Sequence, residues 1–88
     1  MAMSKQTAFR IVGQVSNIIE EAESWLQEAK RSVEYHTKQL SQEELSDWNK
    51  EYHTKKLAES NAIVLFLENK LNATSQIQEH FLKVVTEQ

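Results

Sequence analysis

Three histidines, His36, His53 and His80, are the side chains of this sequence best suited to binding a metal ion or to transferring protons near neutral pH. Metal sites on helices usually take ligands three or four residues apart, and no two of these histidines have that spacing. No glutamate lies three residues before any of them. The sequence therefore predicts no metal site.

His36 differs from the other two histidines because it falls within a regular apolar pattern. Such a position predicts partial burial, which favours the neutral form of the ring at pH 7. We expect this ring to pack against Trp48 and its nitrogens to find a polar neighbour. A pH switch is the alternative interpretation.

The residues that enzymes use for covalent or phosphate chemistry are missing. The chain has no cysteine and a single glycine, Gly13, so it has neither a thiol nucleophile nor a glycine-rich phosphate loop. The acidic run at Glu20, Glu21 and Glu23 is typical of a solvated helix face. We therefore predict no catalytic residue, no cofactor and no enzymatic activity.

The composition favours an all-α protein with one domain over residues 1–88. Proline is absent, and residues that favour helices dominate. No apolar run has the length of a signal peptide or a membrane span, so we expect a cytoplasmic protein with no membrane partner. The 10 Lys and Arg residues are scattered and face 13 Asp and Glu residues, which argues against nucleic acid binding.

The first predicted helix has an apolar seam in which steps of four and three residues alternate without a miss. This spacing is typical of a heptad pattern on one helix face. The seam consists of Ala8, Val12, Val15, Ile19, Ala22, Leu26, Ala29, Val33, His36 and Leu40.

A second helix is predicted to begin at Ser41, because Ser41 and Glu44 have the spacing of a capping box. A short connection makes this helix antiparallel to the first, as in a helical hairpin. The residues 62–67 are apolar on every side and predict a helix buried on more than one side, with a buried strand as the alternative. The predicted inward face consists of Leu45, Trp48, Tyr52, Ala58, Ala62, Leu65 and Phe66.

A break is predicted at residues 72–75, since Ser75 and Gln78 repeat the capping-box spacing. The short third helix after it would present an apolar stripe of Ile77, Phe81, Val84 and Val85. An unbroken second helix is the alternative. The predicted fold is thus all-α, a long antiparallel helical hairpin with a short third C-terminal helix.

One short motif occurs twice: residues 34–38 and 51–55 both read Glu-Tyr-His-Thr-Lys. In the predicted faces the two copies are out of phase, because His36 lies on the first seam whereas Tyr52, not His53, lies on the second. We interpret the repeat as a coincidence or a drifted duplication. A duplicated binding epitope is the alternative.

The apolar surface exceeds what one interface between two helices can cover. Phe9, Ile11, Ile18 and Trp25 lie beside the first seam, and we predict that they bind a protein partner or a second copy of the chain. Completion of a monomeric three-helix core is the alternative.

Part of the second helix resembles the small helical-hairpin co-chaperones of the type III secretion needle subunit. The resemblance covers about a quarter of the chain and rests on Trp48, Lys56, Leu57, Glu59, Ala62, Ile63 and Leu67. It implies a chain that forms a heterodimer with a larger helical chaperone and keeps an aggregation-prone subunit soluble. We therefore expect a protein interaction module, an adaptor or co-chaperone; the alternatives are a small phage or bacterial inhibitor, or a structural homodimeric bundle.

Overall fold

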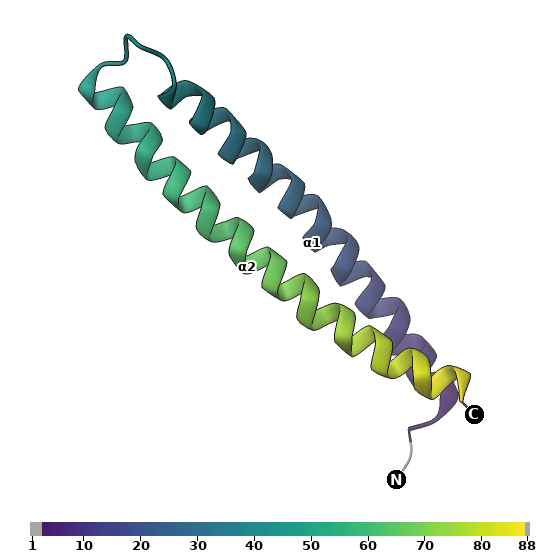
Figure 1. Ribbon diagram of the computed structural model, residues 1–88. Helices are drawn as coiled ribbons and strands as arrows, with labels where there is room; N and C mark the ends of the chain where they lie inside the picture. Colours follow the sequence, from purple (N-terminus) through teal and green to yellow (C-terminus); the bar gives the residue numbers. More distant parts are fainter. Residues whose placement is uncertain (1–2, 88) are drawn as a thin grey trace.

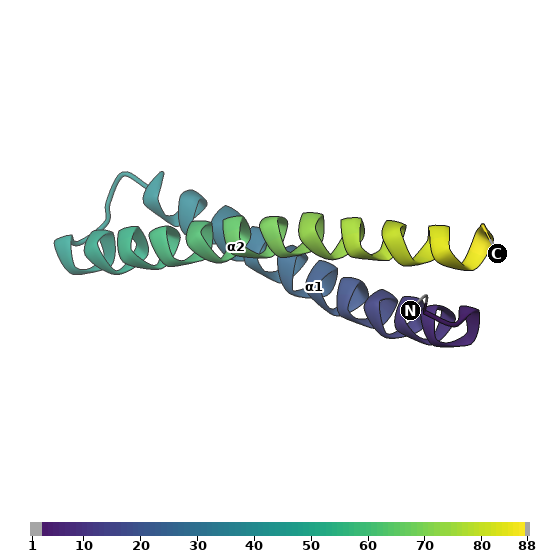
Figure 2. The same ribbon diagram turned by 90° about the horizontal axis from the view of Figure 1, so that it is seen from below.

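The computed structural model describes residues 3–87 as two long antiparallel helices (Figure 1). Helix α1 spans Lys5–Leu40 and α2 spans Asp47–Thr86, with a short connection over residues 41–46. The hairpin measures 64 × 17 × 14 Å, and the helices cross rather than run strictly parallel (Figure 2). No strand occurs among the described residues, so the all-α helical hairpin is confirmed.

The predicted seam of α1 is confirmed along its whole length. Every seventh residue is buried against α2, namely Ala8, Val15, Ala22, Ala29 and His36. The alternate seam residues, namely Val12, Ile19, Leu26, Val33 and Leu40, are half-buried. Because the fully buried positions are mostly alanine, the two backbones can approach closely along this line.

The second helix begins later than the capping box at Ser41 predicts, so that prediction is wrong. Ser41 has helical backbone angles, φ −81° and ψ −6°, and its hydroxyl donates to the Lys38 carbonyl at 2.7 Å, so it ends α1. Ser46 is extended, with φ −63° and ψ 156°, and its hydroxyl accepts the Asn49 amide at 3.2 Å. Asp47 follows in the first turn, where the helix dipole favours an acidic side chain.

Replacing Ser46 by alanine is therefore expected to lower the free energy of unfolding by about 1 kcal/mol, the usual cost of losing an N-cap. Urea unfolding measures this change, with Glu44→Ala as the control, since Glu44 lies outside both helices. A larger loss for Glu44→Ala than for Ser46→Ala would restore the capping box as the start of α2.

The predicted third helix is wrong, because α2 continues without interruption through residues 72–75 to Thr86. The Thr74 hydroxyl donates to the Lys70 carbonyl at 2.6 Å, so this side chain satisfies its hydrogen bond within the helix. Nothing in this segment removes a backbone donor or requires a positive φ. Capping-box spacing alone therefore does not end a helix whose backbone bonds can continue.

The predicted inward face of α2 is also wrong. The buried residues are His53, Ser60 and Leu67, whereas Trp48 is 71% exposed and Phe66 is 64% exposed. Successive residues are about 100° apart around a helix. A predicted face that is shifted by one residue, as from Leu67 to Phe66, therefore does not point at the other helix. In the apolar segment 62–67 only Leu67 is buried, which overturns the expectation of a segment buried on more than one side.

The core is thin and lies along the line between the two helices. Ala22, Ala29 and Leu67 form its centre, and Leu26, Val64 and Leu71 pack against them. No large side chain among the described residues is completely buried. Neither helix has, within those residues, a stretch apolar enough to cross a membrane.

Candidate functional site

Two buried histidines meet across the hairpin near the connection. The Nδ1 atoms of His36 and His53 are 2.8 Å apart, and each residue is 8% exposed. At this distance one ring donates its Nδ1 proton and the other accepts it, so the neutral pair holds two different tautomers. The prediction that His36 packs against Trp48 is wrong, because His53 takes that place.

The histidine pair also shows that the two Glu-Tyr-His-Thr-Lys copies are in phase, contrary to the prediction. The Tyr35 ring lies 6.0 Å from the His53 ring, and the Tyr52 ring lies 6.1 Å from the His36 ring. Each tyrosine therefore meets the histidine of the other copy, as an approximate two-fold axis between antiparallel helices requires. The repeat builds one shared structural cluster rather than two separate epitopes.

Burial of the His36 ring lowers its pKa below the usual 6.5, and electrostatic repulsion from His53 and Lys56, which opposes a positive charge on the ring, lowers it further. Tyr35 and Tyr52 complete the surroundings of the pair. Among the described residues, no group of three or more His, Cys, Asp or Glu side chains is placed to hold a metal ion. The hydrogen bond between the two rings allows the pair to exchange a proton.

This lowered pKa predicts a dependence of stability on pH. The unfolded chain takes up a proton at His36 near pH 6.5, whereas the folded chain does so only at lower pH. The free energy of unfolding should therefore be highest above about pH 6.5 and fall as the pH decreases below it. Urea unfolding at several pH values measures the effect.

His36→Gln should flatten this dependence, and the exposed His80→Gln should leave it unchanged. Identical pH profiles for the wild type and His36→Gln would show that the pair does not control acid stability.

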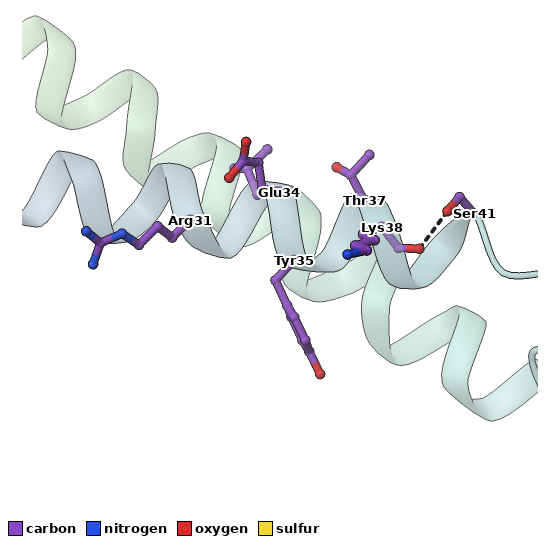
Figure 3. A pocket seen from close by; sticks show the side chains of 7 residues that line it. Arg31, Glu34, Tyr35, Thr37, Lys38 and Ser41 are labelled. Atoms are coloured by element: carbon purple, nitrogen blue, oxygen red, sulfur yellow. Dashed lines mark hydrogen bonds between the residues drawn. The ribbon is translucent and has the colours of Figure 1, made fainter.

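One surface depression lies on α1 beside the connection (Figure 3). All of its lining comes from one helix and its C-cap. Tyr35 points away from Thr37 and Ser41, while the Ser41 hydroxyl bonds to a backbone carbonyl. The lining residues are Arg31, Val33, Glu34, Tyr35, Thr37, Lys38 and Ser41.

The four predicted partner-binding residues do not form one patch. Phe9 is 69% exposed and lies in a shallow depression with Gly13 and other residues of the outer side of α1. Ile11, Ile18 and Trp25 follow one another at steps of seven residues and share a different side of the helix. Trp25 is 59% exposed, Ile18 is 43% exposed and Ile11 is half-buried.

Helix α2 supplies residues to this surface that the sequence analysis missed. Trp25 and Ile63 line one depression together with Ala29 and Ser60, so apolar side chains from both helices meet there. The signal available in the sequence was the spacing of Ile63 and Ile77, which are two steps of seven residues apart and so share one side of a helix. We call this surface the Trp25 face; it consists of Ile11, Ile18, Trp25, Ile63, Phe66 and Ile77.

The opposite side of the hairpin carries a second apolar surface, the aliphatic face. Its two rows are the half-buried seam residues of the helices, and Leu26, Val64 and Leu71 at its centre pack against the core. On α1 the row consists of Val12, Ile19, Leu26, Val33 and Leu40, and on α2 of Leu57, Val64, Leu71 and Val85.

Comparison with known proteins adds no family to these observations. No family model matches this chain. Neither the curated proteins nor the solved structures contain a match. The residues that resemble the secretion co-chaperones point in different directions on α2, since Trp48 is exposed and Leu67 is buried. The two apolar faces therefore carry the functional interpretation.

Proposed function

We propose that this chain is a protein interaction module, an adaptor that binds an amphipathic helix of a partner protein on its Trp25 face. The observation that supports this function is the depression between the helices, where Trp25 and Ile63 remain 59% and 51% exposed after the hairpin has closed. Large apolar side chains that stay exposed on two adjacent helices are typical of a binding surface.

The charged residues beside the Trp25 face indicate which charges a partner helix should carry. Glu28 lines the depression on the α1 side, and Glu21 lies seven residues before it. Lys56 and Lys70 lie at steps of seven residues from Ile63 on the α2 side. A helix that places apolar residues over Trp25 and Ile63, with basic residues towards α1 and acidic residues towards α2, fits this surface.

A co-chaperone for an aggregation-prone helical subunit is one form of this function, and the resemblance of α2 to the secretion co-chaperones led to that prediction. Inhibition of a target protein is another form. Both require the same contact with a helix, so the first experiment concerns the contact itself.

Trp25→Ala is expected to weaken binding of the partner by roughly thirtyfold, since a buried aromatic anchor contributes about 2 kcal/mol or more. The partner is captured from an extract of the source organism with tagged wild-type chain, purified, and its Kd is measured by calorimetry. Circular dichroism of the variant should remain helical.

Trp48→Ala is the matched control, because Trp48 is also exposed but lies among Glu51, Tyr52 and Lys55 of one helix. The proposal is overturned if Trp25→Ala binds as tightly as the wild type, or if Trp48→Ala loses as much affinity. It is also overturned if no protein binds the wild-type chain with saturable affinity.

A further inference from the structure

The hairpin exposes more surface than a chain of its mass normally does. Its accessible surface is 6926 Å², whereas a folded monomer of 10.3 kDa is expected to expose roughly 5,400 Å². The surplus is thus roughly 1,500 Å² for each chain. Covering it on two copies would bury roughly 3,000 Å², which is within the range of permanent homodimers.

The aliphatic face is the part of that surface that looks like half of a protein core. It consists of Val, Ile and Leu side chains, whereas the Trp25 face carries aromatic residues and lysines beside them. Permanent interfaces resemble a domain core cut in half, and transient ones favour aromatic and polar residues. Charged residues such as Glu23, Lys30 and Glu68 are exposed at its edges.

The aliphatic face is also complementary to itself. Its rows consist of the same residue types, with five aliphatic residues on α1 and four on α2, where Gln78 stands between Leu71 and Val85. When two such faces stack, each aliphatic row meets an aliphatic row of the other chain. Isologous interfaces of closed dimers need this property.

We propose that the aliphatic face binds a second copy of this chain, so that two hairpins stack into a four-helix bundle. The core of one hairpin is thin, with Leu67 as its only buried apolar residue larger than valine among those described. A partner that completes such a core must be present whenever the chain folds, and another copy meets that condition. The Trp25 faces remain on the outside of the bundle, so the dimer and the proposed partner contact use different surfaces.

Sedimentation equilibrium of the purified chain tests this inference without any other protein. The wild type is expected to be a dimer at micromolar concentration, and its Tm is expected to rise with concentration. The double variant Leu26→Gln with Val64→Gln should raise the dimer Kd at least about a hundredfold.

The matched control is Trp25→Gln with Ile63→Gln, whose two positions are the immediate neighbours of those in the first variant but belong to the opposite face. This control should keep the dimer Kd of the wild type. If the first variant does not fold, the single variant Val64→Ala replaces it, with an expected rise in Kd of about tenfold.

The inference is overturned by a wild-type chain that is monomeric at every concentration with a constant Tm. It is also overturned if the Trp25 and Ile63 variant dissociates while the Leu26 and Val64 variant stays dimeric. A dimer that survives the Trp25 and Ile63 changes but no longer binds the partner separates this inference from the proposed function.

Discussion

Replacing Leu67 by alanine is expected to destabilise the chain by about 2 to 5 kcal/mol, the largest effect of any side-chain truncation. Leu67 is 7% exposed and fills the space opposite Ala22 and Ala29, where no other long side chain reaches the centre line. Alanine at this position would leave a cavity flanked by two more alanines, which cannot expand to fill it.

Urea unfolding at a fixed protein concentration measures this loss, because any self-association makes stability depend on concentration. Leu65→Ala is the control two residues away, since Leu65 is 62% exposed. A change below about 0.5 kcal/mol for Leu67→Ala, or an equal change for Leu65→Ala, would move the core away from Leu67.

Replacing Ala73 by proline is expected to cost about 3 kcal/mol or more, because α2 runs through this position without a break. Proline removes the amide that would bond four residues back and places its ring against the preceding turn. Ala73→Gly is the control and should cost only about 1 kcal/mol, since it keeps the amide.

Thermal unfolding and the loss of helical circular dichroism measure both variants. A proline that costs no more than the glycine would mean that the chain bends or ends at residues 72–75, as the capping-box spacing predicted.

The buried face of α1 was predictable because its apolar pattern is compatible with only one such face. Ten seam positions alternate without interruption, and only His36 is polar. In such a helix the apolar stripe and the contact face are the same, so burial follows directly from spacing.

Helix α2 was not predictable in the same way, because its contact face contains polar residues. His53 meets His36, the Ser60 hydroxyl lies 2.7 Å from that of Ser32, and Gln78 donates to the Ser16 hydroxyl at 2.7 Å. Each polar group is satisfied from the other helix, which the sequence of α2 alone does not reveal.

The sequence predicted the α1 part of the Trp25 face but not the α2 part. Ile11, Ile18 and Trp25 share one side of α1, but Phe9 points elsewhere and the contribution of α2 was missed. The predicted inward face of α2 included Phe66, which is 64% exposed, and the prediction did not bring Ile63 beside Trp25.

The single connection between the helices also sets the order in which the chain can fold. The two histidines are 17 residues apart in sequence, the bonded serines 28, and Ser16 and Gln78 62. Closing the longest of these loops from the open chain costs about 1 kcal/mol more entropy than closing the shortest. The contacts between the two helices should therefore form first at the histidine pair and last at the chain ends, and they should break in the opposite order.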